Sequence, residues 1–259
     1  MSYDSGVLAN SDPGDVIMVY VVFSDIHSNL EALRAFEKSI KNVPHDKRVC
    51  LGDIVGYGAD PNSVTQWIRK NCQIVLGGNH DFAVAGKTDT SYFNSYALEA
   101  CVWTRKKLES PNLEFLRLLG TKLVEDGITW VHSSPFQPEK WHYITSNSDG
   151  DVNFKNFYTQ VCFVGHSHIP LILEQDPEGK VRAFLRTEYR LKPTHRYIFN
   201  VGSLGQPRDR NPDSSFVTYE SEEGIIRFNR FPYDLASTQR KILREGLPSY
   251  LAERLKIGR

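Results

Sequence analysis

The first part of the chain alternates short apolar runs with segments whose apolar residues recur at helical spacing. Residues 16–24 form a continuous run rich in β-branched and aromatic side chains, which is typical of a strand buried on both faces. In residues 29–43, apolar side chains recur every three or four positions until Pro44 ends the pattern, which predicts an amphipathic helix. The same arguments predict strands at 48–51 and 73–76 and helices at 61–71 and 92–108.

From residue 123 onward the pattern changes to short strands joined by tight turns. Asp126 and Gly127 form a strong two-residue turn signal inside the strand-like stretch 122–131. Further strands are predicted at 161–164, 171–173, 181–185, 197–201, 215–220 and 225–230, and closing helices at 234–245 and 248–255.

This order of elements favours the α/β class. A β-α-β-α-β beginning followed by mostly antiparallel strands suits one layered domain in which two sheets pack face to face between helices. Residues 1–15 are small, polar and aperiodic, so we expect a flexible leader. We expect residues 16–259 to form a single domain that includes the C-terminal helices.

Composition narrows the class of protein and its partners. Lys and Arg equal Asp and Glu at 31 each, so the formal net charge is zero and we expect no long nucleic acid as partner. The longest apolar stretch, 16–23, is too short to span a bilayer, and the four cysteines form no CxxC pair. We therefore expect a cytoplasmic protein with buried, reduced thiols and no membrane partner. The composition leaves a homo-oligomer open.

Five short polar clusters follow predicted strands. In open α/β sheets, loops at the carboxyl ends of strands assemble into sites, so the five clusters are expected to converge. Five of the eight histidines lie in them; for His45, His142 and His195 we expect surface or structural roles. The clusters are Asp25-Ile26-His27, Gly52-Asp53, Gly78-Asn79-His80-Asp81, Val131-His132 and Gly165-His166-Ser167-His168.

The side chains in these clusters have the chemistry of a metal site. Imidazole, carboxylate and one amide without thiolate favour Mn²⁺, Fe²⁺ or Zn²⁺ over Ca²⁺ or Mg²⁺. Seven candidates exceed the four ligands of a tetrahedral zinc and suit two ions that share a carboxylate. Two divalent ions against two aspartates would leave positive charge that attracts phosphate. The candidates are Asp25, His27, Asp53, Asn79, His132, His166 and His168.

The ordered motifs DIH, GDIVGYG, GGNHD, VHS and GHSH resemble those of the calcineurin-like metallophosphoesterases. Within that superfamily the chain is most similar to bacterial and archaeal phosphoesterases grouped with diadenosine tetraphosphatases. The 200–208 segment and the 234–255 tail carry this narrower likeness. The resemblance implies a four-layer αββα sandwich of two mixed sheets flanked by helices.

The resemblance also implies a role for each candidate. Asp25, His27 and His168 would bind a first metal, Asn79, His132 and His166 a second, and Asp53 would bridge them. The cofactors would be two divalent transition-metal ions per chain, drawn from Mn, Fe, Zn, Ni or Co, with Mn favoured. A hydroxide bridging them would attack phosphorus. His80, with a pKa near the working pH and oriented by Asp81, would protonate the leaving group or stabilise charge on it.

The expected function is a metal-dependent phosphohydrolase acting on phosphoester or pyrophosphate bonds of small substrates, dinucleoside polyphosphates among them. Arg208 is the candidate for contact with substrate phosphate, and Asn29 and Tyr57 for lining the pocket. Protein Ser/Thr phosphatases carry an arginine in the block that here is GDIVGYG, which disfavours a phosphoprotein substrate. That class and a nuclease stay as alternatives. A non-catalytic scaffold is the least favoured, because all seven ligand candidates are present.

Overall fold

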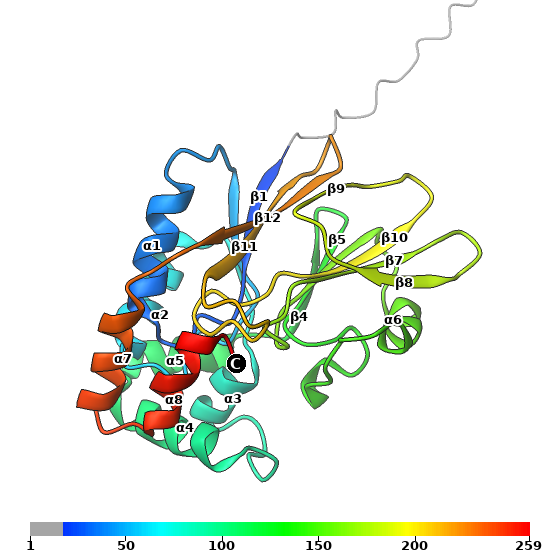
Figure 1. The fold of residues 1–259 in the computed structure, drawn as a ribbon. Coiled ribbons are helices and arrows are strands. Elements are labelled where there is room, and N and C mark those ends of the chain that lie inside the picture. Colours follow the sequence, from blue (N-terminus) through cyan, green and yellow to red (C-terminus); the bar gives the residue numbers. More distant parts are fainter. Residues whose placement is uncertain (1–17) are drawn as a thin grey trace, which may run out of the picture.

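The computed structural model describes residues 18–259, so the predicted leader and the first residues of the first predicted strand lie outside it (Figure 1). Its strands form two mixed sheets of six. The first sheet has the order β3 (Ile74–Val75), β2 (Lys47–Cys50), β1 (Val19–Phe23), β11 (Ser214–Glu220), β12 (Ile225–Phe231) and β9 (Glu188–Arg190). The second sheet has the order β4 (Lys122–Glu125), β5 (Ile128–Val131), β6 (Val161–Val164), β10 (Arg196–Asn200), β7 (Leu171–Gln175) and β8 (Val181–Phe184).

Helices cover the outer faces of both sheets. Figure 1 shows most of them on the side of the first sheet, with α6 beside the second. No helix among residues 18–259 is long and apolar enough to cross a membrane. The helices are α1 (Leu30–Ile40), α2 (Pro61–Asn71), α3 (Asn79–Ala85), α4 (Ser95–Lys107), α5 (Ser110–Leu118), α6 (Asn147–Asn153), α7 (Leu235–Arg244) and α8 (Ser249–Glu253), with short 3₁₀ helices η1 (Pro138–Lys140), η2 (Phe154–Asn156) and η3 (Arg254–Ile257).

Strand β1 shows why the layers form. Successive side chains of a strand point to opposite faces. Phe23 packs with Phe36 of α1 in the core between helices and first sheet, whereas Tyr20 packs with Trp130 of β5 in the core between the two sheets. A strand buried on both faces therefore lies at the centre of the sandwich. The predicted αββα fold is confirmed.

The predicted helices and strands are confirmed. The structure adds four short elements that were not predicted, and it corrects one prediction about strand pairing. Helices α3, α5 and α6 and strand β9 were not predicted, because each is nine residues or shorter and lacks a clear apolar period. The expectation of mostly antiparallel pairing is wrong at the centre of the second sheet, where β5, β6 and β10 run parallel. The predicted hairpins β4–β5 and β7–β8 form its two edges.

Parallel pairing brings the polar clusters together. β1 and β2 are parallel, as are β5 and β6. In each pair, the loops that follow the two strands therefore start at the same end of the sheet, where the strands have their carboxyl ends. The loop after β1 is joined to the loop after β2 by the Asp25 N–H, which donates to the Gly52 carbonyl at 2.9 Å. The two sheets are joined where His132, after β5, contacts the Leu51 carbonyl, after β2, at 3.1 Å.

Asn29 links three parts of the scaffold. It caps α1: its Oδ1 accepts the Ala32 N–H at 3.0 Å and the Thr238 hydroxyl at 3.0 Å, and its Nδ2 donates to the Gly205 carbonyl at 2.8 Å. The side chain thus ties α1 to α7 and to the 200–208 segment.

We expect Asn29→Ala to lower the free energy of unfolding by about 2 kcal/mol, because it removes a helix cap together with two buried hydrogen bonds. Urea denaturation followed by circular dichroism measures this. Asn94→Ala is the matched control: Asn94 caps α4 through a single bond to the Ala97 N–H at 2.9 Å, so its loss is expected to cost about 1 kcal/mol. Equal losses in the two variants would show that the contacts of Asn29 with Gly205 and Thr238 add no stability.

Candidate active site

The strand-end loops hold several predicted site residues in an unusual backbone conformation. Asp25, His27, Asp53, His166 and His168 all have positive φ, between 48° and 65°. Non-glycine residues adopt this left-handed conformation rarely, and such strain gathers at functional sites. Backbone hydrogen bonds between the loops hold it in place, including the bond from the His27 N–H to the Asp53 carbonyl at 3.0 Å.

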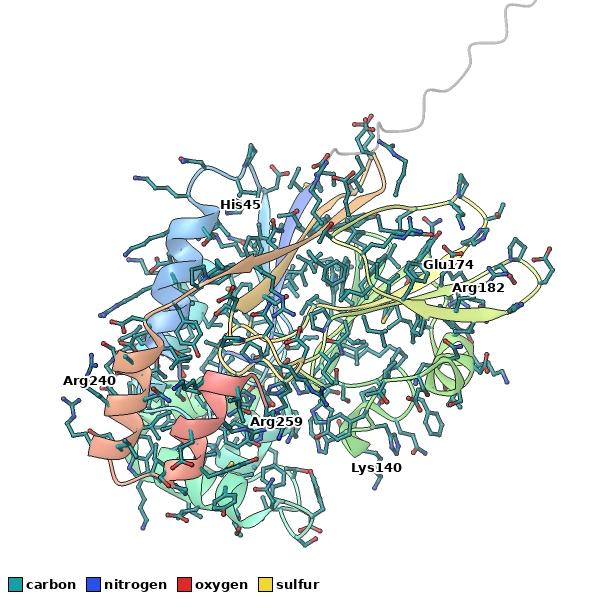
Figure 2. All side chains as sticks on the ribbon, viewed as in Figure 1. His45, Lys140, Glu174, Arg182, Arg240 and Arg259 are labelled. Atoms are coloured by element: carbon teal, nitrogen blue, oxygen red, sulfur yellow. The ribbon has the colours of Figure 1, made fainter. Side chains whose placement is uncertain are left out.

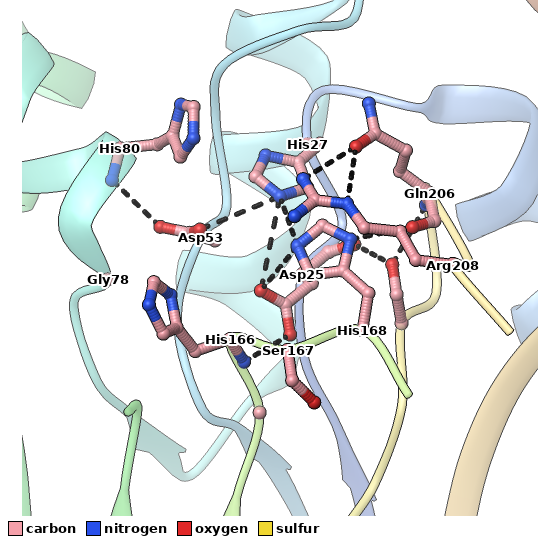
Figure 3. A network of polar contacts seen from close by, with 12 residues as sticks. Asp25, His27, Asp53, Gly78, His80, His166, Ser167, His168, Gln206 and Arg208 are labelled. Carbon is pink, nitrogen blue, oxygen red and sulfur yellow. Dashed lines mark hydrogen bonds and ion pairs between the residues drawn. The ribbon is translucent and has the colours of Figure 1, made fainter. Parts of the chain in front are cut away.

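One group of side chains surrounds Asp25. Ligand atoms of Asp25, His27, Asp53 and His168 lie within 4.8 Å of one another, and all four residues are buried (Figure 3). His168 Nε2 is 3.3 Å from Asp25 Oδ1 and 3.2 Å from His27 Nε2.

A second group shares Asp53 with the first. Ligand atoms of Asp53, His132 and His166 also lie within 4.8 Å of one another. Asp53 Oδ2 is 3.6 Å from His27 Nε2 on one side and 3.6 Å from His132 Nε2 on the other. Asn79 is buried, and its Oδ1 has no hydrogen-bond partner within residues 18–259. Asp25, His27 and His168 thus lie on one side of Asp53, and His132 and His166 lie on the other.

Main-chain carbonyl groups fix which nitrogen of each imidazole carries the proton. A carbonyl oxygen only accepts, so the nitrogen facing it holds the N–H and the other nitrogen presents a lone pair. In all four histidines that lone pair is left for the carboxylate cluster. The carbonyl contacts are His27 Nδ1 to Val55 at 3.0 Å, His132 Nδ1 to Leu51 at 3.1 Å, His166 Nε2 to Trp141 at 2.9 Å and His168 Nδ1 to Gln206 at 2.6 Å.

This arrangement fits metal cations. The lone pairs of His27 and His168 face each other at 3.2 Å with no proton to share. Asp25 Oδ1, Asn79 Oδ1 and His132 Nε2 are buried without a hydrogen-bond partner in the described part of the chain. Buried polar atoms are normally satisfied, and a cation would satisfy all of these at once. Nitrogen and oxygen donors without sulfur suit borderline divalent ions.

Burial sets the charge of the cluster. It lowers the pKa of His132 and of His166 to about 3, so both imidazoles are neutral and able to bind metal at pH 7. It also raises the pKa of Asp25, and the pKa of Asp53 is raised well above its usual value by burial and by the neighbouring carboxylates Asp25 and Asp81. Buried carboxylates this close together need positive charge nearby, as a divalent ion supplies.

The expected environment of His80 needs two corrections. Asp81 does not orient the imidazole: its carboxylate accepts the N–H groups of Gly78 at 3.0 Å, Ile54 at 3.2 Å and Val55 at 3.0 Å, and so fixes the loop after β2 against α3. The pKa of His80 is not near neutrality. Burial lowers it well below its usual value and the charge of Arg208 lowers it further, so the imidazole is neutral.

A cysteine contacts His80 instead. Cys101 Sγ of α4 lies 3.4 Å from His80 Nδ1, and burial raises the pKa of this thiol, which therefore keeps its proton. Gly56 lies close to the ring: a Cβ there would come within 2.6 Å of Nδ1, and its φ of 91° also favours glycine. The His80 N–H donates to Asp53 Oδ1 at 2.9 Å, which fixes the Asp53 carboxylate through the backbone.

A cavity of about 200 Å³ opens onto the cluster. Tyr57 and Arg208 line it, as expected, whereas Asn29 does not. Arg208 donates from Nε and Nη2 to Gln206 Oε1, at 3.2 and 2.8 Å, and the ring of Tyr143 stacks on His166 at 4.2 Å. The lining residues are Asp53, Tyr57, Asn79, His80, Tyr92, Phe93, Asn94, Ala97, Lys140, Trp141, Tyr143, His166, His168 and Arg208.

The remaining histidines lie elsewhere, as the sequence indicated. His45 contacts the Val43 carbonyl at 2.7 Å and lies away from the carboxyl ends of the strands, where the site residues are (Figure 2). His142 is exposed. No motif in the sequence indicated a functional role for Cys101, Tyr143 or Arg254. For Cys101 only the apolar side of α4 could have indicated burial.

Residues 18–224 match the family model described as the calcineurin-like phosphoesterase superfamily domain. The chain belongs to this superfamily. An uncharacterized protein from Methanocaldococcus jannaschii is 40% identical over 248 residues, which cover 92% of this chain and 97% of that protein. The crystal structure of a metallophosphoesterase from Sphaerobacter thermophilus is similar with a TM-score of 0.84 and 35% identity, covering 94% of this chain and 100% of that one.

A hypothetical protein from Pyrococcus horikoshii OT3 shares the fold, with a TM-score of 0.77 at 20% identity over 93% of this chain and 98% of that one. As a calcineurin-like phosphoesterase, the chain is a hydrolase that acts on phosphoester bonds. The superfamily is metal-dependent, and this chain has two Asp and His groups that could hold metal ions. The family match ends at residue 224, before α7, α8 and η3.

Proposed function

We propose that this phosphoesterase hydrolyses phosphoester or pyrophosphate bonds of small substrates with two divalent transition-metal ions. The observation that carries the proposal is the Asp53 carboxylate, whose Oδ2 lies 3.6 Å from an inward-facing nitrogen in each of two groups. Asp25, His27 and His168 would hold one ion and Asn79, His132 and His166 the other. These imidazole and carboxylate ligands suit Mn²⁺, Fe²⁺ or Zn²⁺, and of these we favour manganese.

Bound metal would supply an activated water and positive charge for the phosphoryl oxygens. The protein's own groups would do the rest. Arg208 donates two hydrogen bonds to Gln206, which holds its planar guanidinium at the cavity wall for a substrate phosphate oxygen. The cavity is small and the net charge is zero, which supports small substrates over long nucleic acids.

His80 would act on the leaving group as a neutral hydrogen-bond donor. The protonated thiol of Cys101 can donate to Nδ1, which leaves the imidazole proton on Nε2. An N–H at Nε2 would stabilise charge on the departing oxygen. The four ligand histidines face carbonyl groups and present lone pairs, whereas His80 faces a thiol and presents an N–H.

Metal-stripped protein refilled with Mn²⁺, Ni²⁺ or Zn²⁺ tests the proposal. Each form is assayed with a chromogenic phosphomonoester, a chromogenic phosphodiester and diadenosine tetraphosphate, and metal content is measured by mass spectrometry. We expect about two ions per chain, no turnover in the stripped protein and recovery on refilling, with Mn²⁺ most effective. Hydrolysis by the stripped protein, or none by any refilled form, would refute it.

A further inference from the structure

Two arginines from distant parts of the chain converge on the side chain of Tyr57. Arg208 Nη2 lies 3.5 Å from Tyr57 Oη, and Arg254 of η3 lies over the ring of the same side chain. Each guanidinium carbon is 5.8 Å from the centre of the Tyr57 ring. The pKa of Arg254 is lowered by burial and by the positive charge of Arg208, which agrees with two close, partly desolvated cations.

No carboxylate of an Asp or Glu side chain within residues 18–259 forms an ion pair with either arginine. Asp209 follows Arg208 directly but pairs with Arg230 of β12. Arg254 donates its Nε–H to the main-chain oxygen of Arg259, and the chain supplies no further partner for its two Nη groups in the described residues. Two like charges side by side raise the free energy of the folded protein, and an anion bound between them would lower it.

The pair lies beside the proposed metal ligands. The Tyr57 ring, which both arginines contact, is 4.4 Å from the His80 ring and 4.7 Å from the His27 ring, centre to centre. Arg208 lines the cavity itself. Arg254 is held from behind by Tyr250 of α8, with its guanidinium carbon 5.3 Å from the centre of that ring. Arg254 therefore has a fixed position and is separated from the metal-ligand cluster by the Tyr57 side chain.

We infer that Arg208 and Arg254 form a subsite for a second phosphate group of the substrate, next to the phosphate that is hydrolysed. The inference rests on the proposed function and deepens it: the substrate class becomes compounds that carry at least two phosphates, such as diphosphates. Guanidinium groups bind phosphate oxygens through paired, charge-assisted hydrogen bonds, and two of them match the charge of a terminal phosphate. Arg254 would be a specificity-determining residue supplied by the C-terminal helices.

The test compares phenyl phosphate with phenyl diphosphate on Mn²⁺-loaded protein, with Arg254→Gln, Arg254→Lys and the control Arg244→Gln. Arg244 lies on α7 and is exposed. For Arg254→Gln we expect kcat/KM with the diphosphate to fall about 10- to 100-fold more than with the monophosphate, through KM. The inhibition constant of methylenediphosphonate should rise by a similar factor relative to methylphosphonate. The kcat/KM of Arg254→Lys with the diphosphate should lie between those of the wild type and Arg254→Gln. Arg244→Gln should match the wild type on both substrates.

Equal losses on the two substrates, or no loss on either, would overturn the subsite while leaving the proposed function standing. Wild-type protein that hydrolyses the chromogenic phosphodiester but neither of these compounds would overturn the subsite alone. Wild-type protein that also hydrolyses neither the phosphodiester nor diadenosine tetraphosphate would overturn the proposed function and the subsite with it. Because Arg254→Gln also removes a contact with Tyr57, thermal melting is recorded for each variant. Arg254→Lys keeps the charge and serves as the test if the glutamine variant does not fold.

Discussion

Replacement of Asp53 by asparagine is expected to remove metal from both groups and to lower kcat at least about 1,000-fold, the scale of losing a group that stabilises charge in the transition state. Asparagine keeps the shape of aspartate, and its Oδ1 can still accept the His80 N–H that bonds Asp53 at 2.9 Å. What it lacks is the negative charge between His27 and His132. Metal content by mass spectrometry and turnover of a chromogenic ester measure the two effects.

Asp25→Asn provides the internal comparison. Asp25 lies only in the group with His27 and His168, so its variant is expected to lose the ion of that group and to keep more metal than Asp53→Asn. Asp151→Asn, on the exposed surface of α6, is the matched control for the loss of one carboxylate and should bind metal as the wild type does. If Asp53→Asn retains two ions per chain, Asp53 does not bridge two metals.

The sequence predicted that these Asp and His side chains lie close together, because each of them stands in a short local pattern. A strand of β-branched residues followed by Asp-x-His predicts both the strand and the side chains that leave its carboxyl end. Parallel pairing of the strands then brings these ends together. The motifs at 25–27 and 166–168 can be recognised without knowing any tertiary contact.

The surroundings of the cluster could not be predicted, since they depend on contacts between segments without motifs. Asp81 was expected beside the imidazole that precedes it, but in a helix adjacent residues point in different directions, and its carboxylate meets the loop after β2. Cys101 has the composition of a core residue, and only the packing of α4 against α3 places it at His80. Arg254 approaches Tyr57 only because α7 and α8 fold back over the site.

His80→Ala is expected to lower turnover of substrates with poor leaving groups by roughly 100- to 1,000-fold and to leave metal content close to that of the wild type. The contact that His80 makes with Asp53 comes from its backbone N–H, which alanine retains, so the bridging carboxylate keeps its position. Activated aryl esters need less stabilisation of the leaving oxygen and should lose less. Turnover of a series of esters with leaving groups of increasing pKa, beside metal analysis, measures this.

Variants of Cys101 separate the hydrogen bond from simple packing. Cys101→Ser keeps a donor toward Nδ1, which lies 3.4 Å from Sγ, whereas Cys101→Ala removes the donor and leaves a buried imidazole nitrogen without a partner. We therefore expect the alanine variant to show part of the leaving-group dependence of His80→Ala and the serine variant to retain most of the wild-type rate. Both variants remove the sulfur atom, but only serine keeps a γ atom that can donate a hydrogen bond. If the two lose turnover equally, or if His80→Ala loses metal in proportion to activity, His80 does not act on the leaving group as a donor set by Cys101.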